Sequence, residues 1–447
     1  MMKWLGKIGG ALLALVLLAW GLTAAAPQHA QAAKTLTSSR TPTFWVLSDD
    51  HFIAPALHDN RTAFREIQQS AAGKDLRYQP IAIRALVHEA LTARPRPTAV
   101  ILTGDVTLNG AKASAESLAK RLAPLQKAGI HVLAIPGNHD IYDGWARKYQ
   151  GKQQLKVEQI SPTDWRNIFS DGYRNETSED ADSLSYTMNL NRDYQLIMLD
   201  SNIYTIQPSN RNPNTGGELK PATMSWLRSR LAAGQKAGRT SLVFMHHNLY
   251  SHNAMVNHGY VLNNASALRK LLTTYHVPVV FSGHIHAQDI KSGSQPGEPV
   301  EIVNGAFSIS PGGYGVVQLT PTKLTYDRKA VNVLPVLSAK QRQNPDLRHY
   351  QPYLKRLFLQ NGEALALNSL YGKKLSPQKQ AAGVKFLGQL NWRFFTGQDA
   401  LSNAQAAKLR KTPGYQVDNQ LPSLHRYMQS IMQDKDRNDL HQVIATN

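Results

Sequence analysis

The sequence VLAIPGNHD occupies residues 132–140 and joins an apolar run to a turn with three polar side chains. The apolar run is short and β-rich, so it predicts a buried strand. Asn138, His139 and Asp140 follow it, and amide, imidazole and carboxylate groups are typical of metal ligands and proton carriers. Gly137 lets the backbone turn sharply as it leaves the strand. The stretch therefore predicts a strand whose carboxyl end presents polar side chains to a site.

The same pattern recurs at four other apolar runs. The runs at 43–47, 99–102, 242–245 and 277–281 are followed by Asp49-Asp50-His51, Gly104-Asp105, His246-His247 and Gly283-His284-Ile285-His286, respectively. A sixth strand is expected at 196–199 without such a cluster. In open α/β sheets, ligands bind beyond the carboxyl ends of the strands. We therefore expect the five clusters to converge on one site.

Helical patterns separate these runs. One helix is expected around 118–125, a second opens at Pro221, and a third follows an N-cap at Asn264. This alternation predicts a layered α/β domain over 40–334. Residues 340–447 lack β runs and show helical spacing, which predicts a small all-helical C-terminal domain.

The first 33 residues predict an export signal. Two lysines precede an apolar stretch at 8–22, and an A-x-A cleavage site follows at 30–32. Cleavage is expected just after that site, and the alternative is an uncleaved anchor that continues through Ala26. Either alternative predicts a secreted or otherwise extracytoplasmic protein.

Composition narrows the chemistry and the partners. The chain has 447 residues and no cysteine, which excludes disulfide frameworks, thiolate metal sites and cysteine nucleophiles. Its formal net charge of +19 favours polyanions, although a solubilising surface explains the charge equally well. Residues 340–447 hold 16 basic and 7 acidic side chains, nearly half of the net charge. The tail could dock on an anionic cell wall or membrane, or cap the catalytic domain; no specific nucleic-acid partner is predicted.

The donor types predict a two-metal site. Carboxylate, imidazole and amide ligands without thiolate suit manganese, iron or zinc. The clusters contain more ligands than one ion needs, and two ions that share a carboxylate can clamp a phosphoryl group. No Walker loop, dinucleotide glycine pattern or G-x-S-x-G elbow is present.

The ordered set of D-x-H, G-D-x-x-x-x-G, G-N-H-D, H-H and G-H-x-H resembles the calcineurin-like metallophosphoesterases, within them the class III cyclic nucleotide phosphodiesterase type. The strings SDDHFIAPALHDN, GNHDIYDGWAR, DSLSY, HHNLYSH and FSGHIHAQDI resemble an exported group from Gram-positive bacteria with a C-terminal helical domain. The resemblance implies a four-layer α/β/β/α sandwich around two metal ions. By this resemblance, the ligands of the first ion are Asp49, His51 and His286. The ligands of the second ion are Asn138, His246 and His284, and Asp105 bridges the two ions.

The resemblance also implies catalytic roles. His139 resembles the residue that contacts the phosphate and protonates the leaving oxygen. Asp140 resembles the acidic residue that follows it in many family members, and it is predicted to be catalytic without an assigned role. Asp50 departs from the usual pattern because it adds an acid to the middle of D-x-H. Either His246 or His247 could be the ligand, and the family favours the first.

Three functions are compatible with these patterns. The first is an exported phosphodiesterase that acts on small cyclic nucleotides or related diesters by metal-hydroxide attack. The second uses the same chemistry on phosphomonoesters, nucleotides or cell-envelope phosphodiesters. The third is a non-catalytic wall-binding protein, against which the complete ligand set argues. Four further side chains could contact a substrate or belong to exposed loops: Tyr142, Arg147, His252 and His258.

Overall fold

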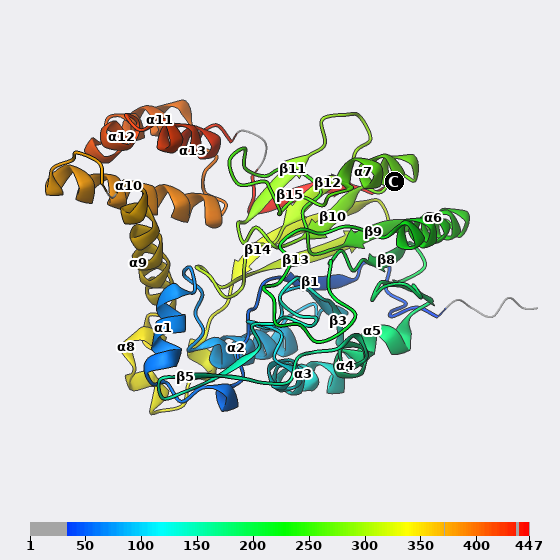
Figure 1. Ribbon diagram of the computed structural model, residues 1–447. Helices are drawn as coiled ribbons and strands as arrows, with labels where there is room; N and C mark the ends of the chain where they lie inside the picture. Colours follow the sequence, from blue (N-terminus) through cyan, green and yellow to red (C-terminus); the bar gives the residue numbers. More distant parts are fainter. Residues whose placement is uncertain (1–33, 371, 435–437, 447) are drawn as a thin grey trace, which may run out of the picture. The chain divides into compact units, whose positions relative to one another are not determined.

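Two β-sheets packed face to face form the centre of the structure, a computed structural model (Figure 1). It describes residues 34–370, 372–434 and 438–446, so the predicted export signal at 1–33 lies outside the described residues. Within the described ranges, no helix combines the length and apolar character needed to cross a bilayer.

The first sheet contains three of the strands predicted from the sequence. Its spatial order is β15-β14-β13-β1-β2-β3; β1, β2 and β3 pair in parallel, and the other pairings are antiparallel. The strand bounds are β1 Thr43–Leu47, β2 Ala99–Thr103, β3 His131–Ile135, β13 Gly313–Thr320, β14 Lys323–Ala330 and β15 His441–Ala445.

The second sheet contains the other three predicted strands, displaced by one or two residues at their ends. Its order is β11-β12-β10-β9-β8-β7-β6, with β12, β10, β9 and β8 parallel and antiparallel strands at both edges. The bounds are β6 Ser178–Glu179, β7 Tyr186–Asn189, β8 Tyr194–Met198, β9 Thr240–Phe244, β10 Val279–Ser282, β11 Asp289–Ser292 and β12 Val300–Val303. A separate hairpin joins β4 (Arg147–Gln150) to β5 (Gln153–Lys156).

Aromatic side chains fill the space between the two sheets. Phe44 from the first sheet lies 5.8 Å from Phe244 and 6.0 Å from Phe281 between ring centroids. All three are fully buried, while Trp45, the next residue in β1, packs into the outer apolar cluster. This alternation follows from the two-residue period of a strand. The inner core fixes the positions of the strand ends that carry the polar clusters.

Helices cover the outer faces of both sheets, so the expected α/β/β/α sandwich is present (Figure 1). Helices α1 to α5 share an apolar cluster with the first sheet, and α6 and α7 share one with the second. Their bounds are α1 Thr62–Ser70, α2 Gln79–Thr92, α3 Lys112–Lys127, α4 Pro162–Ile168, α5 Ser170–Asn175, α6 Pro221–Lys236 and α7 Ala265–Thr274, and the short 3-10 turn η1 is Pro55–Leu57. Asn264 precedes α7 without capping it, because its side chain bonds both backbone groups of Leu219.

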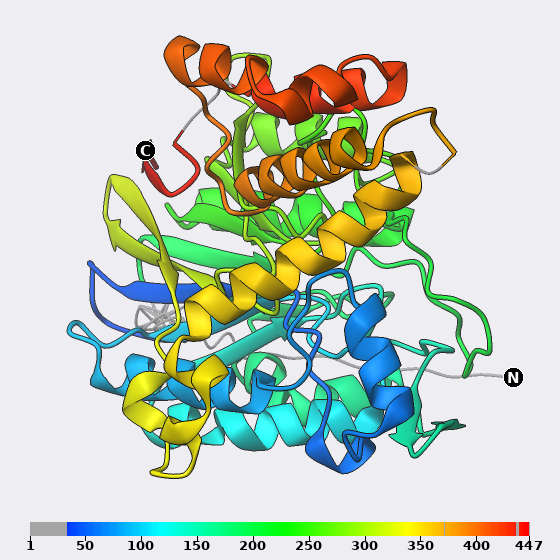
Figure 2. The same cartoon turned by 90° about the vertical axis from the view of Figure 1, so that its left-hand side faces the viewer.

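The C-terminal region is helical, as expected, and α9 runs along one side of the α/β layers toward the remaining helices (Figure 2). Its helices and 3-10 turns are η2 Leu334–Val336, η3 Gln341–Gln343, α8 Pro345–Arg348, α9 Tyr350–Leu370, α10 Pro377–Phe395, α11 Asn403–Arg410, α12 Pro413–Asp418 and α13 Pro422–Met432. The chain then returns to the first sheet as β15, which pairs with β14. Local patterns did not predict this strand, because only Ile444 of β15 is buried.

Hydrogen bonds and apolar contacts hold the helical region against the α/β layers. The hydroxyls of Tyr350 and Tyr353 donate to the buried carboxylate of Asp75 at 2.8 and 3.1 Å. The indole of Trp392 donates to Ser310 Oγ at 3.1 Å. Phe358 packs with apolar residues at 306–309, close to the strand ends. These contacts match the expectation of a cap that packs on the catalytic domain.

Candidate metal centre

The loops after β1, β2 and β10 hold an unusual backbone. Five non-glycine residues in them have φ values in the left-handed region: Asp49 (54°), His51 (43°), Asp105 (48°), His284 (69°) and His286 (64°). Residues other than glycine rarely adopt this backbone conformation. It persists where the surrounding structure enforces it, often at functional sites. All five belong to the metal-type clusters expected from the sequence.

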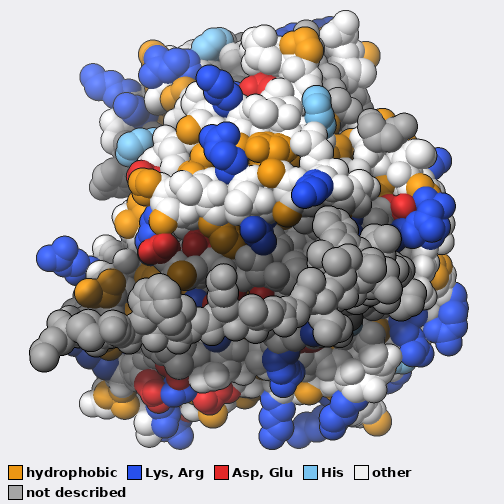
Figure 3. Space-filling model, turned by 90° about the vertical axis from the view of Figure 1, so that its right-hand side faces the viewer, with side chains coloured by type: hydrophobic (Ala, Val, Ile, Leu, Met, Phe, Trp, Pro, Cys, Tyr) orange, Lys and Arg blue, Asp and Glu red, His pale blue; other side chains and the backbone are white. Residues whose placement is uncertain are grey.

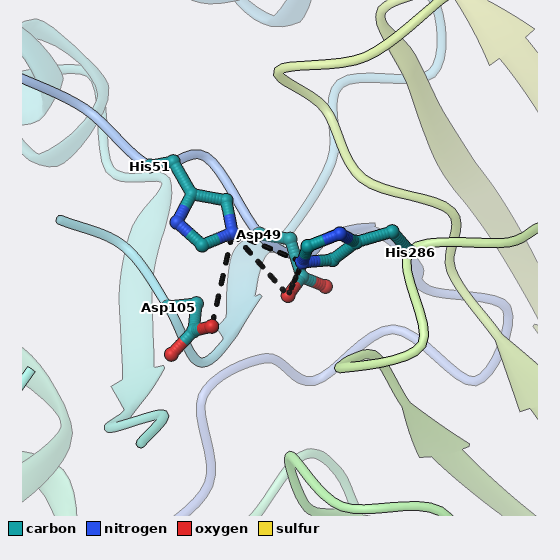
Figure 4. Close-up of side chains that lie close together, drawn as sticks. All are labelled: Asp49, His51, Asp105 and His286. Carbon is teal, nitrogen blue, oxygen red and sulfur yellow. Dashed lines mark hydrogen bonds and ion pairs between the residues drawn. The ribbon is translucent and has the colours of Figure 1, made fainter. Parts of the chain in front are cut away.

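Four of the expected side chains form a first group (Figure 4). Asp49, His51, Asp105 and His286 each place one ligand atom within 4.8 Å of the others. The Nε2 atoms of His51 and His286 lie 3.0 Å apart. His286 Nε2 lies 3.3 Å from Asp49 Oδ1, and His51 Nε2 lies 3.7 Å from Asp105 Oδ2. Side chains from three loops therefore point at one small volume.

The chemistry of this first group fits a cation. Asp49 Oδ1 is buried, faces this group and has no hydrogen-bond partner among the described residues. Buried polar atoms nearly always have partners, so each orphaned atom calls for an explanation. Oxygen and imidazole nitrogen donors without thiolate are the ligands of manganese, iron and zinc. The residues present can therefore hold a divalent or trivalent ion.

A second group lies on the other side of Asp105. Asp105, His246 and His284 again bring ligand atoms within 4.8 Å of one another, and Asn138 Oδ1 lies 3.3 Å from His246 Nε2. His246 Nδ1 lies 2.9 Å from the Thr103 carbonyl, which can only accept. The proton is thereby fixed on Nδ1, so Nε2 is left as a ligand atom facing the group.

The His284 ring is held through its other nitrogen, Nε2, whereas His246 is held through Nδ1. Its Nε2 lies 2.9 Å from the Thr215 carbonyl and 3.0 Å from the Gly259 carbonyl, which leaves Nδ1 as its ligand atom. Both ring nitrogens of His247 are engaged elsewhere, Nδ1 with Ser201 Oγ at 2.8 Å and Nε2 with Thr215 O at 3.2 Å. The geometry therefore favours His246 over His247 as a ligand.

Asp105 connects the two groups. Its Oδ2 faces His51, and its Oδ1 lies 3.4 Å from His246 Nε2. Burial alone would raise the pKa of Asp105, but His246 and His139 hold it well below its usual range. Gly104 has a φ of +94°, and a Cβ there would collide with the His246 ring. The glycine before Asp105 is thus required by both its backbone conformation and the close approach of a ligand.

His139 stands beside the first group with its ring centroid 5.5 Å from that of His51. Its Nδ1 lies 3.1 Å from Asp143 Oδ2, and the Asp143 side chain is fully buried. Burial alone would lower the pKa of His139, but Asp105 and Asp143 raise it above its ordinary value. Asp143 was not among the residues predicted from the sequence, because it lies in a loop where a four-residue spacing carries no helical signal.

Asp140 has contacts that suit a positioning role. It is fully buried, and its carboxylate accepts from the backbone N–H groups of Val106, Thr107 and Gly137 at 2.8–3.2 Å. It therefore ties the loop after β2 to the loop after β3. Its inclusion among catalytic residues stays a prediction, and these bonds account for it as a brace between ligand loops.

Asp50 belongs to neither group. Both of its carboxylate oxygens are buried without a hydrogen-bond partner among the described residues. Burial, reinforced by Asp49 and Asp140, raises the pKa of Asp50 well above its usual range. The extra acid in the D-x-H motif therefore favours its neutral form.

The remaining candidates lie in different settings. Arg147 donates to the backbone carbonyls of its own loop, and Tyr142 lines a cavity that also contains Asn138. His252 is buried between Asp289 and Glu301, at 2.5 and 2.8 Å, and His258 is exposed. His252 is therefore a structural residue, and Tyr142 shares a cavity with the predicted ligand Asn138.

Lys74 is a site residue for which no motif gave a signal. It lines one cavity with His51 and His139 and another with His286. Burial lowers its pKa, while Asp105 and Asp49 act in the opposite direction. Lys74 therefore adds a cation between the first group and both cavities.

Comparison with known families is consistent with this geometry. Residues 42–288 match the calcineurin-like phosphoesterase family, and residues 332–438 match the C-terminal domain of cyclic nucleotide phosphodiesterase. The chain therefore belongs to the calcineurin-like phosphoesterases, metal-dependent enzymes that hydrolyse phosphoesters.

Solved structures with a similar chain path have low sequence identity. A dimetal phosphatase from Danio rerio is 15% identical, covers 65% of this chain and 96% of its own, and gives a TM-score of 0.48. Purple acid phosphatase PPD1 from yellow lupin (Lupinus luteus) seeds is 12% identical. The match covers 66% of this chain and 52% of the lupin chain, with a TM-score of 0.38. GAP50, the anchor in the inner membrane complex of Plasmodium, is 15% identical. The match covers 65% of this chain and 85% of the GAP50 chain, with a TM-score of 0.39. No curated protein matched the chain.

Proposed function

We propose that this protein is an exported phosphodiesterase that uses two metal ions to hydrolyse cyclic nucleotides or related phosphodiesters. The observation that carries the proposal is Asp105, whose two carboxylate oxygens face two separate groups of ligands. The match of residues 332–438 to the C-terminal domain of cyclic nucleotide phosphodiesterase supports this substrate class.

Each group of side chains would hold one ion. Asp49, His51 and His286 would hold the first and Asn138, His246 and His284 the second, with Asp105 shared between them. A bound pair of such ions supplies Lewis-acid charge to the phosphoryl oxygens and lowers the pKa of a bound water. Manganese, iron and zinc are the candidates.

The protein's own side chains would position the ester and move its proton. Asp143 fixes His139 through Nδ1, so Nε2 would donate a proton to the leaving oxygen. The ammonium of Lys74, beside the same group, would pair with a phosphate oxygen. Through its hydrogen bonds to both loops, Asp140 would hold the loop of Asp105 in place against the loop of His139.

A phosphomonoesterase, nucleotidase or cell-envelope phosphodiesterase of the same fold is the alternative. Cavities of about 260 and 300 Å³ share Lys74 in their walls. An open-chain diester carries two organic groups on its phosphorus, whereas a monoester carries one and a cyclic nucleotide carries one nucleoside through both ester oxygens. The two cavities would therefore suit an open-chain diester best, and a cyclic nucleotide would place its nucleoside in one of them.

Export and an anionic surface partner belong to the same proposal. The basic start, the apolar stretch at 8–22 and the A-x-A site at 30–32 support secretion. Figure 3 shows Lys and Arg side chains spread over one described face, with acidic side chains in fewer places. Such a surface would be attracted to cell-wall polymers or anionic lipid.

A substrate panel tests the proposal. Purified protein loaded with manganese, iron or zinc would be assayed on cyclic nucleotides, on nucleotides and on nitrophenyl mono- and diesters. We expect a higher kcat/KM on diesters than on the matched monoesters. A preference for monoesters would favour the alternative, and no hydrolysis with any metal would contradict the proposal.

A further inference from the structure

The helical region contributes one wall of a cavity at the metal centre. This cavity, called here the aromatic cavity, has a volume of about 300 Å³. Its tail-side wall includes Phe358 of α9, Phe395 of α10 and Tyr427 of α13. Its other wall includes His286 and Lys74. The tail therefore closes a space that borders the first ligand group.

The aromatic cavity is connected to the reacting centre through shared residues. Lys74 also lines the second cavity, which contains His51 and His139. A phosphate held at the ligand groups and paired with Lys74 would thus lie close to both His139 and the aromatic cavity. In a cyclic nucleotide both ester oxygens belong to one ribose, so the leaving oxygen would face His139 while the base of the same nucleoside extends into the aromatic cavity.

The walls of the cavity suit a planar ring that also forms hydrogen bonds. The rings of Phe358 and Phe395 lie 5.1 Å apart between centroids at an interplanar angle of 54°. The Tyr427 hydroxyl donates to Asn391 Oδ1 at 2.7 Å, so the amide NH₂ of Asn391 is the group it can offer a ligand. Aromatic faces with a few placed polar groups are typical of sites that take a heterocyclic base.

The walls are also fixed in place. Phe358 packs so closely on Gly73 that a Cβ there would lie 2.9 Å from its ring. Lys74 follows directly, so α9 holds the loop that carries the cation. The backbone N–H of Gln288 donates to the Phe395 carbonyl at 3.2 Å, which ties the end of α10 to the loop of His286. A preformed cavity binds a rigid ring with little ordering cost.

We propose that the aromatic cavity binds the nucleobase of the substrate, so that the C-terminal helices select nucleoside phosphodiesters over simpler phosphoesters. This inference rests on the proposed phosphodiesterase function and specifies its substrate class. A base packed against the rings of Phe358, Phe395 and Tyr427 would leave its sugar phosphate beside Lys74 and the first ligand group.

Ring-removing variants of the full chain test the inference. Phe395→Leu removes a ring from the cavity but keeps an apolar side chain. Phe386→Leu is the matched control, because Phe386 lies in the same helix but packs with Tyr415 inside the tail, 5.8 Å away between centroids. Tyr427→Ala and Tyr427→Phe separate the ring from the hydroxyl.

The substrates are adenosine 3′,5′-cyclic phosphate and the same cyclic phosphate on a methyl riboside without a base. We expect Phe395→Leu and Tyr427→Ala to lower kcat/KM for the nucleotide roughly ten- to hundredfold relative to the base-free ester. Tyr427→Phe should retain most of the selectivity, and Phe386→Leu should leave the ratio of the two kcat/KM values unchanged. Equal losses on both substrates, or an unchanged ratio in the cavity variants, would overturn the inference.

Equilibrium binding separates this inference from the proposed function. Calorimetry on the metal-loaded protein would compare adenosine 5′-phosphate with ribose 5-phosphate. We expect the nucleotide to bind at least about tenfold more tightly and Phe395→Leu to remove that preference. Equal affinities would overturn the cavity assignment even for an active enzyme. A base preference in a protein that cleaves no diester would support the cavity while contradicting the phosphodiesterase proposal.

Discussion

His139 Nδ1 lies 3.1 Å from Asp143 Oδ2, and this pairing determines which ring nitrogen can serve a substrate. A carboxylate accepts the Nδ1 proton, so Nε2 is the nitrogen left for proton transfer. Asp143 is fully buried, and its other oxygen accepts from the Trp145 backbone N–H at 2.8 Å. The pair is therefore oriented by the loop after β3 before any substrate arrives.

Loss of His139 should depend on the leaving group. General acid catalysis contributes roughly a hundred- to ten-thousand-fold, and a good leaving group needs little of it. We expect His139→Ala to reduce kcat on a ribose or alkyl diester by that factor and on a nitrophenyl diester far less. Equal reductions on both esters would show that His139 positions phosphate and does not donate a proton.

Loss of Asp143 should shift the pH profile. Asp143 contributes to the raised pKa of His139, so Asp143→Asn should lower that pKa. The protonated histidine would then be lost at a lower pH, and the falling alkaline limb of kcat on the alkyl diester should move to lower pH. Asp182→Asn, at an exposed site, serves as the control. An unmoved alkaline limb in Asp143→Asn would contradict the pairing.

Much of the fold could be predicted because the same pattern, an apolar strand run followed by polar ligand-type residues, occurs several times along the chain. Strand runs such as 43–47 have continuous apolar character, and each of five is followed by ligand types, so their convergence follows from the parallel sheets. Local patterns could not reveal Asp143 or Lys74, because a lone acid or lysine in a loop has no spacing signature. β15 escaped detection because its residues are mostly exposed. His252 looked like a loop residue, since its partners Asp289 and Glu301 lie far along the chain.

Replacement of His252 should destabilise the fold in a pH-dependent way. Burial alone would lower its pKa, but Glu301 and Asp289 raise it to about 10. A histidine with a folded pKa above its unfolded value of about 6.5 stabilises fully below pH 6.5, and this contribution disappears as pH rises through about 10.

Chemical denaturation between pH 6 and 10 measures this effect. Breaking a buried ion pair costs on the order of 3–5 kcal/mol, so His252→Asn should lower the free energy of unfolding by about that much at pH 6 and by less near pH 10. His258→Asn, at an exposed position, should change little. A pH-independent difference for His252→Asn would contradict a charged His252.

The contact between the tail and Asp75 should contribute to stability. Hydrogen bonds to a buried carboxylate are worth roughly 1.5–3 kcal/mol, and the Tyr350 hydroxyl makes one at 2.8 Å. We expect Tyr350→Phe to lower the free energy of unfolding by about that amount, as measured by urea denaturation. Tyr275→Phe is the matched control, because Tyr275 follows α7 and packs in the apolar cluster of the second sheet. An unchanged midpoint in Tyr350→Phe would show that this bond does not hold the tail.

The central claim is that Asp105 is shared by two metal ions, and metal content per chain tests it most directly. Elemental analysis of purified, metal-saturated protein should give two equivalents per chain for the wild type. Asp105→Asn should still fold, as judged by circular dichroism, but it should hold clearly less metal because an amide bridges two cations poorly. One equivalent in the wild type, or two equivalents retained by folded Asp105→Asn, would contradict the account.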